Sequence, residues 1–286
     1  MYVIAGVSGN TGRVVADTLL AKGEKVRVIV RDAAKASDFA ARGAEVAIAD
    51  LNDEAAMTKA LQGAKGAYLL IPPNTGATHF RAYQQEMAQA LCAAVRQSAV
   101  PHVVFLSSIG ADKESGTGPI AGLYDAERLF SAIPTTKTQF IRAAYFMENI
   151  GGSLAALAHG VYPSFSPAAF GIPMIASQDI GALAAELLSK GADRTEIINL
   201  GGNATSPSDV AQVLSDLTGK PVSVAETPVA AMAQTLAGYG VPAPIAALYQ
   251  EMTEGMLSDH IAFEPQHRHV MGQTQLGEVL KPMLQR

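Results

Sequence analysis

The chain opens on the stretch YVIAGVSGNTG, residues 2–12, in which three glycines recur at intervals of three. The apolar run Tyr2–Ala5 is typical of a buried strand, and the apolar spacing of residues 12–22 indicates a helix. Glycine permits a tight turn between the two and lets another backbone or a ligand come close. The N-terminus of a helix offers free N–H groups and a partial positive charge to an anion. The stretch therefore predicts a strand–turn–helix unit that binds a diphosphate.

Short apolar runs continue to alternate with helical patterns through the first two thirds of the chain. Further strands are predicted at residues 25–30, 45–49, 66–71, 102–106 and 138–142, and helices at 35–41, 54–61 and 80–98. This alternation predicts a parallel sheet with right-handed crossovers and helices on both faces. The predicted fold class is α/β: a doubly wound parallel sheet, or Rossmann fold, with a smaller, discontinuous C-terminal α/β lobe.

The rhythm of the sequence changes after residue 150. Gly, Ala, Ser and Pro dominate the next two dozen residues, after which helices or strands are predicted at 177–190, 196–200, 208–218 and near 243–257. We expect a dinucleotide-binding domain formed by residues 1–150 plus 174–202. A smaller substrate-binding lobe is expected from residues 151–173 plus 203–286.

Composition excludes several functional classes. The 286-residue chain has a formal net charge of -5, with 49% hydrophobic and 16% charged residues. No Lys/Arg-rich block provides a footprint for nucleic acid, and no apolar run approaches the ~20 residues that cross a bilayer. We therefore expect neither a nucleic-acid partner nor a membrane partner. The single cysteine, Cys92, excludes an internal disulfide and, with no signal-peptide pattern, favours the cytoplasm.

The histidines predict no metal site. The six histidines are scattered, and none has metal-ligand spacing to carboxylates or to the cysteine. The most suggestive group, His267-Arg268-His269, is expected to be an exposed loop.

The opening turn and the second strand predict which dinucleotide binds. The expected phosphate-binding residues all lie in the turn and are Gly6, Ser8, Gly9, Asn10, Thr11 and Gly12. A carboxylate at the end of the second strand binds a ribose 2′-hydroxyl, whereas an arginine there accommodates a 2′-phosphate. Arg31 has this position and Lys35 follows one turn later, so NADP(H) is favoured over NAD(H). Because Asp32 comes next, which of the two side chains faces the ribose stays open.

These motifs resemble those of the NmrA-like branch of the atypical short-chain dehydrogenases, which includes NADPH-dependent quinone oxidoreductases and triphenylmethane reductase. The matching stretches are the Gly-x-x-Gly-x-x-Gly turn at 6–12, VIVRD at 28–32, DLND at 50–53, IPP at 71–73 and RAAYFMEN at 142–149. The last stretch is similar to the family's Arg-Pro-Gly-x-Phe-x-Glu-Asn.

The resemblance also implies roles for residues further along the chain. It implies that Asp50 and Leu51 lie beside the adenine and that Ile71 and Pro72 flank the nicotinamide ribose. By the same resemblance, three residues after the sixth strand line a cleft between the lobes, where flat aromatic substrates stack. These substrate-binding residues are Tyr145, Phe146 and Asn149.

The proton donor stays unassigned. Short-chain dehydrogenases usually protonate the substrate oxygen with a tyrosine activated by a lysine four residues on. Tyr124 and Arg128 keep that spacing with arginine in place of lysine, whereas alignment to NmrA-like relatives places Leu123 and Glu127 at the two positions. Ser108 stands where the family has its orienting serine. Ser108, Tyr124 and Glu127 are therefore the catalytic candidates.

Two functions follow from these observations. Hydride transfer to a quinone or cationic dye depends on proximity and electrostatics more than on a strong general acid. We expect an NAD(P)H-dependent oxidoreductase, NADPH favoured, that reduces quinone-like or other electron-poor aromatic molecules. The alternative is a non-catalytic NAD(P)-binding redox sensor, and only this alternative calls for a protein partner. A homodimer stays open.

Overall fold

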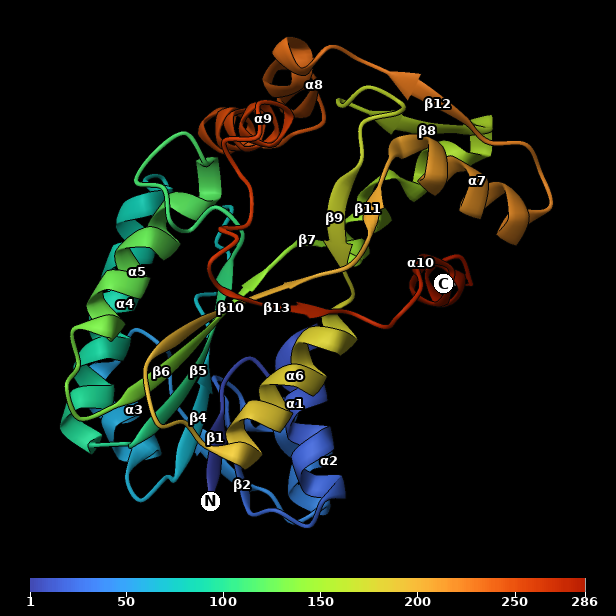
Figure 1. The fold of residues 1–286 in the computed structure, drawn as a ribbon. Coiled ribbons are helices and arrows are strands. Elements are labelled where there is room, and N and C mark those ends of the chain that lie inside the picture. The colour runs from blue at the N-terminus through green and yellow to red at the C-terminus, as the bar shows by residue number, and fades with distance from the viewer. Residues whose placement is uncertain (286) are drawn as a thin grey trace.

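The computed structural model describes residues 1–285 and is built around an eight-stranded sheet (Figure 1). Its order is β13-β10-β6-β5-β4-β1-β2-β3, and every neighbouring pair is parallel. The strands are β1 (Tyr2–Ile4), β2 (Val26–Val30), β3 (Glu45–Ile48), β4 (Gly66–Leu69), β5 (His102–Ser108), β6 (Lys137–Ala143), β10 (Glu196–Gly201) and β13 (Arg268–Met271). The predicted doubly wound parallel sheet is confirmed.

Helices cover both faces of this sheet, and each face has its own apolar core. One face carries α1 (Asn10–Ala21), the short η1 (Ala33–Ala36), α2 (Ser37–Ala41) and α6 (Ser177–Lys190). The other carries α3 (Glu54–Leu61), α4 (Phe80–Ser98) and α5 (Ala121–Ser131). Because both faces are buried, the central strands are nearly continuous runs of apolar residues.

The strand order reverses between β1 and β4. From β1 the chain builds outward through β2 and β3, then crosses back to add β4 on the other side of β1. Tyr2 consequently pairs with both Val26 and Gly66. Ligands of open α/β sheets bind outside the carboxyl ends of the strands at this kind of reversal. The glycine turn that follows β1 lies at this point.

A smaller lobe stands beyond the carboxyl ends of the strands, at the upper right of Figure 1. It holds a three-stranded sheet, β11-β9-β7, and a parallel pair, β12-β8. Its elements are β7 (Tyr145–Phe146), η3 (Met147–His159), β8 (Val161–Ser164), β9 (Ile172–Ile175), β11 (Ala204–Thr205), α7 (Pro207–Thr218), β12 (Ser223–Glu226) and α10 (Leu276–Met283). Residues of η3, α7 and α10 share a separate apolar core.

A helical hairpin joins the lobe back to the main sheet. It comprises η4 (Val229–Ala231), α8 (Met232–Gly238) and α9 (Ala243–Leu257), which lie at the top of Figure 1. The helix α9 rests on η2 (Gly118–Ile120), where a Cβ at Gly118 would collide with the Leu248 backbone. The hairpin therefore packs against the α5 side of the main domain.

The last strand, β13, departs from what the sequence predicts. Residues 268–271 pair in parallel with β10 at the edge of the main sheet, although they fall within the segment 203–286 expected in the smaller lobe. The expectation that residues 267–269 form a loop is wrong for Arg268 and His269. The sequence RHVM carries no apolar run because this strand lies at an exposed edge.

Within residues 1–285, no helix combines the length and apolar character needed to cross a membrane.

Candidate functional site

Two glycines of the opening turn are required by the chain itself. Gly6 has a φ of +69°, and a Cβ added to it would lie 2.7 Å from Leu70 Cδ2. A Cβ on Gly12 would collide with the backbone of Ala5 and Gly6. Gly9 is different, because its φ of -102° suits any residue and a Cβ would meet only the Gly6 carbonyl oxygen at 3.4 Å. The absence of a side chain at residue 9 therefore leaves space for a ligand.

The N-terminus of α1 is open to an anion. Gly9 caps the helix without a side-chain hydrogen bond, and the first turn contains no acidic residue. Ser8 and Asn10 are exposed beside it. Free N–H groups and the helix dipole favour a phosphate at such a position. The turn therefore fits the pyrophosphate of a dinucleotide.

Thr11 differs from its neighbours, because its side chain faces inward. It is 6% exposed, and its hydroxyl accepts a hydrogen bond of 2.9 Å from the hydroxyl of Tyr68 on β4, which is fully buried. Burial is the main cause that raises the pKa of Tyr68, so this phenol is a neutral donor. The bond ties the first turn of α1 to the centre of the sheet.

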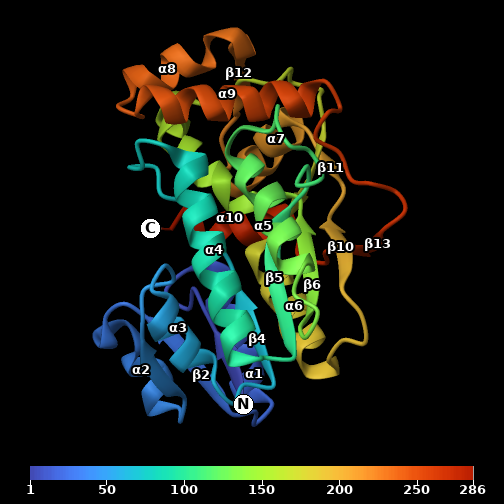
Figure 2. The ribbon, with the colours of Figure 1, turned by 90° about the vertical axis from the view of Figure 1, so that its left-hand side faces the viewer.

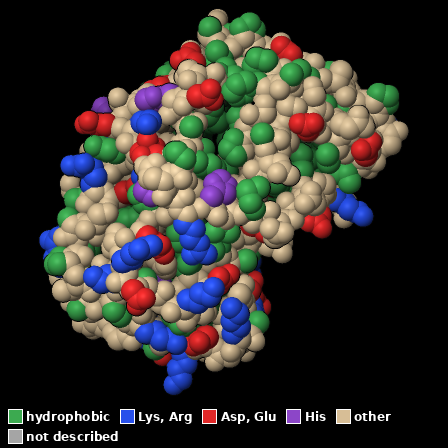
Figure 3. Space-filling view, viewed as in Figure 1, with side chains coloured by type: hydrophobic (Ala, Val, Ile, Leu, Met, Phe, Trp, Pro, Cys, Tyr) green, Lys and Arg blue, Asp and Glu red, His purple; other side chains and the backbone are tan. Residues whose placement is uncertain are grey.

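The end of β2 separates Arg31 from Asp32. The Asp32 carboxylate accepts a hydrogen bond of 3.0 Å from the Ala34 N–H and caps η1. Arg31 and Lys35 are both exposed. In Figure 3, Lys and Arg side chains gather over the lower part of the molecule, where α1 and α2 lie. The Asp32 carboxylate therefore has a backbone partner in η1, whereas Arg31 and Lys35 are accessible to a ligand.

The ends of β3 and β4 hold the remaining residues expected to bind the cofactor. Asp50 is exposed, and Leu51 packs against the apolar core beneath α3 and α4. Ile71 is buried, and the Pro72 carbonyl oxygen accepts a hydrogen bond of 3.1 Å from the hydroxyl of Tyr83 on α4. The structure thus brings these residues to the same edge of the sheet as the glycine turn.

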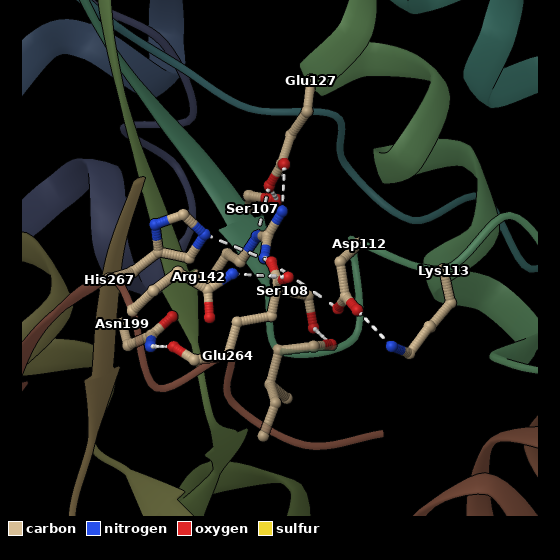
Figure 4. Close-up of polar contacts among 11 residues, drawn as sticks. Ser107, Ser108, Asp112, Lys113, Glu127, Arg142, Asn199, Glu264 and His267 are labelled. Carbon is tan, nitrogen blue, oxygen red and sulfur yellow. Dashed lines mark hydrogen bonds and ion pairs between the residues drawn. The ribbon is translucent and has the colours of Figure 1, made fainter. Parts of the chain in front are cut away.

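A buried ion-pair network occupies the α5 side of this edge (Figure 4). Arg142, on β6, donates to both carboxylate oxygens of Glu127, at 3.0 and 2.7 Å. The Ser107 hydroxyl donates to the same carboxylate at 2.5 Å. Glu127 stands where the resemblance expects the lysine of the dehydrogenase dyad. Its carboxylate, however, forms an ion pair with Arg142.

The network also fastens the segment that precedes β13. Arg142 Nη1 donates to Glu264 at 2.6 Å and lies 3.9 Å from Asp112 (Figure 4). Asn199 holds the Glu264 carbonyl oxygen at 2.8 Å. Burial alone would lower the pKa of Arg142, but Glu127 and Glu264 raise it, so the guanidinium is charged.

The other catalytic candidates lie around this network without forming a dyad. Ser108 donates to the Ile109 carbonyl oxygen at 3.0 Å. Leu123, at the family's tyrosine position, packs among apolar residues beneath α9. The Arg128 guanidinium lies over the Tyr124 ring, with 5.4 Å between its Cζ and the ring centre. Tyr124 also lines an open cavity of about 280 Å³ together with Glu127 and Arg142. The arrangement therefore offers no activated tyrosine.

The three residues expected to bind substrate follow β6 and lie in three different environments. Tyr145 packs on the core of the smaller lobe, Phe146 on that of the main domain, and Asn149 is exposed. Burial raises the pKa of Tyr145 against the effect of its hydrogen bond to Asn149. Burial also raises the pKa of Tyr162, a neighbour in the lobe core, to about 12. Both phenols are therefore neutral hydrogen-bond donors.

Several residues of the site lie beyond the reach of the sequence patterns. In the sequence, Tyr68 is only one member of an apolar strand and Tyr83 one member of the apolar stripe of a helix. The one available signal is that a buried tyrosine hydroxyl usually has a hydrogen-bond partner. Glu264 gives no signal, because 122 positions separate it from Arg142.

Comparison with known proteins agrees with this architecture. The model of the NmrA-like family matches residues 2–276. The chain is 27% identical to an NAD(P)H azoreductase of Xenophilus azovorans over 92% of this chain and 89% of the relative. It is 30% identical to quinone oxidoreductase 2 of Escherichia coli over 89% and 87%.

A solved structure extends the likeness to the whole molecule. The NADPH complex of an NADPH-dependent quinone oxidoreductase from Escherichia coli superimposes with a TM-score of 0.78 at 25% identity, over 99% of this chain and 100% of that one. The glycine turn and the sheet order are those expected from the resemblance, and the family model covers nearly the whole chain. This chain belongs to the NmrA-like family.

Proposed function

We propose that this protein is an NADPH-dependent reductase of quinones and similar electron-poor aromatic molecules. The observation that carries the proposal is the open N-terminus of α1 above Gly9, at the point where the strand order reverses. Two relatives that match most of the chain are named for quinone and azo reduction. Arg31 and Lys35 would hold the 2′-phosphate, while the glycine turn would hold the pyrophosphate.

The residues of this chain would act mainly by binding and orientation. The bound dinucleotide supplies the hydride. A quinone takes up the hydride at one oxygen, and the resulting hydroquinone anion acquires its proton from water, so no activated tyrosine is required. Neutral phenols such as Tyr145 are suited to donate a hydrogen bond to the oxygen that becomes negative. Leu123, at the family's tyrosine position, packs against apolar residues and has no proton to donate.

The proposal is tested with purified protein, NADPH and a panel of benzoquinones and naphthoquinones, by following absorbance of the reduced nicotinamide. We expect quinone-dependent oxidation well above background, slower with NADH. No oxidation above background with any quinone, while NADPH still binds, would refute the reductase.

The same experiment addresses a second candidate, a redox sensor that binds NAD(P) and docks a partner protein. Its specific support is that Leu123 and Glu127 occupy the two positions of the catalytic dyad, and that Glu127 is paired with Arg142. Binding without turnover would favour this function, whereas quinone-dependent turnover would count against it.

A further inference from the structure

A side chain from α4 reaches the carboxyl end of β4. Tyr83 lies in the first turn of α4, half buried, and its hydroxyl donates to the Pro72 carbonyl oxygen at 3.1 Å. Its ring packs on the apolar core beneath α3 and α4, as does Leu51 at the end of β3. A residue that served the core alone could be Phe or Leu, so the hydroxyl calls for a separate explanation.

The hydrogen bond closes the base of a loop. The chain leaves the sheet after Leu69 and enters α4 at Phe80, and residues 73–76 between them are exposed. In Figure 2 this loop projects from the upper end of α4. On its sheet side, the Leu70 side chain lies against Gly6 of the phosphate turn. The end of β4 is thus held between the phosphate turn and Tyr83.

Two further strands end at the same edge of the sheet as β4. Burial is the main cause that raises the pKa of Tyr83, the Asp50 carboxylate raises it further, and the Arg31 guanidinium lowers it. Asp50 follows β3 and Arg31 follows β2, and both strands run in the same direction as β4, so three strand ends converge at the edge of the sheet that Tyr83 reaches through Pro72.

From this convergence we propose that Tyr83 is a positioning residue for the adenosine half of NADP(H). Its hydroxyl fixes the Pro72 carbonyl, and its ring gives the adenosine an apolar wall at the edge where β2 and β3 end. The inference therefore places Pro72 at the adenosine half of the cofactor, instead of beside the nicotinamide ribose as the resemblance implies. The inference rests on the NADP(H)-binding part of the proposed function and is independent of the substrate. Tyr83 thus contributes to nucleotide binding, although the helical pattern of the sequence indicates only a core residue.

The test separates the two halves of the cofactor. The probes are 2′,5′-ADP, which carries the adenosine and the 2′-phosphate, and reduced nicotinamide mononucleotide, which carries neither. Tyr83→Phe keeps the ring and removes the bond to Pro72, whereas Tyr83→Leu removes the ring as well. Tyr239→Phe is the matched control, because Tyr239 is 81% exposed in the α8–α9 connection.

We expect Tyr83→Phe to weaken 2′,5′-ADP binding roughly threefold to tenfold, the scale of one lost hydrogen bond. Tyr83→Leu should weaken it further, and the Tyr239 control should bind normally. Binding of reduced nicotinamide mononucleotide should be unchanged in every variant. A purely structural role would lower the unfolding midpoint without this selective loss.

Two results would overturn the inference. One is unchanged 2′,5′-ADP affinity in Tyr83→Phe; the other is equal weakening of both probes. If Tyr83→Leu does not fold, the conservative Tyr83→Phe variant still decides. Failure of the wild-type protein to reduce quinones would refute the reductase and leave this binding result standing, so the two failures are distinguishable.

Discussion

At the scale of a single residue, we propose that the charge of Arg31 at the end of β2 selects between the two dinucleotides. Its neighbour Asp32 would repel a 2′-phosphate, but that carboxylate accepts the Ala34 N–H. Because Asp32 caps η1, the local fold favours Arg31 as the side chain that meets the 2′-phosphate in the proposed complex.

Replacement of Arg31 by Ala should reduce the preference for NADPH over NADH. A hydrogen bond to a charged group contributes about 1.5–3 kcal/mol, so the ratio of the two dissociation constants should fall by about tenfold or more. Calorimetric titration of both dinucleotides measures this ratio. Arg194→Ala is the control, since that side chain is 81% exposed away from the glycine turn, and an unchanged ratio in Arg31→Ala would contradict the assignment.

Glu127 and Arg142 form a buried pair whose separation should be costly. Glu127→Ala leaves a buried guanidinium without its main partner, and we expect the free energy of unfolding to fall by about 3 kcal/mol or more. The double variant Glu127→Leu with Arg142→Met should lose less than this single variant, because no buried cation remains. Denaturant unfolding measures both.

A surface pair provides the comparison for this experiment. Glu186 and Lys190 lie on the outer side of α6 and are largely exposed, so Glu186→Gln should change the free energy of unfolding by less than about 1 kcal/mol. If Glu127→Ala costs no more than Glu186→Gln, the network is not a stabilising feature of the site.

At the scale of elements, the turn between β1 and α1 combines two different requirements for glycine. Gly6 and Gly12 are needed for the backbone of the turn and its packing, whereas Gly9 meets no such constraint. The helix that follows has neither a side-chain cap nor an acidic residue in its first turn, so its N-terminal N–H groups can bind an anion.

Substitution of these glycines by alanine should separate folding from binding. Gly9→Ala should change the free energy of unfolding of the cofactor-free protein by no more than about 1 kcal/mol, the scale of an N-cap exchange. It should weaken NADPH binding by roughly tenfold, or about 1.4 kcal/mol. Gly12→Ala, with its backbone collision, should lose stability as well, and normal NADPH binding by Gly9→Ala would show that residue 9 does not approach the cofactor.

At the scale of the whole molecule, a few polar ties join the lobe to the main domain. Asp179, in the first turn of α6, accepts hydrogen bonds from the Gln273 N–H at 3.1 Å and from the Thr274 N–H at 3.0 Å. Its other oxygen accepts from the Thr274 hydroxyl at 2.9 Å. The chain then enters α10, which packs in the lobe core. The carboxylate therefore couples the lobe to α6.

Asp179→Asn should loosen this coupling without unfolding the sheet. The variant keeps the shape but loses the charge and places an amide donor near two N–H groups, so hydrogen exchange in residues 272–283 should accelerate by about tenfold. Exchange in β5 and β6 should not change. Asp193→Asn, on an exposed residue after α6, is the control, and equal exchange in both variants would remove Asp179 as the tie.

The sequence by itself determined the features that depend on neighbouring residues. Helices predicted at 80–98 and 177–190 coincide with α4 and α6, because helical periodicity is a local property. The glycine spacing likewise determined the turn, since the positive φ of Gly6 and the collision that a Cβ on Gly12 would make with Ala5 and Gly6 arise within a few residues. From these, the alternating order of strands and helices led to the parallel sheet.

Only the tertiary structure decided which distant side chains meet. Glu264 reaches Arg142 across 122 positions, Tyr83 reaches Pro72 from another element, and the short polar β13 becomes a strand because β10 offers it an edge. These contacts depend on how elements cross in space, and a local pattern carries no record of that. For the same reason, the sequence shows that the dyad is missing, whereas only the fold shows that Glu127, at one of its two positions, pairs with Arg142.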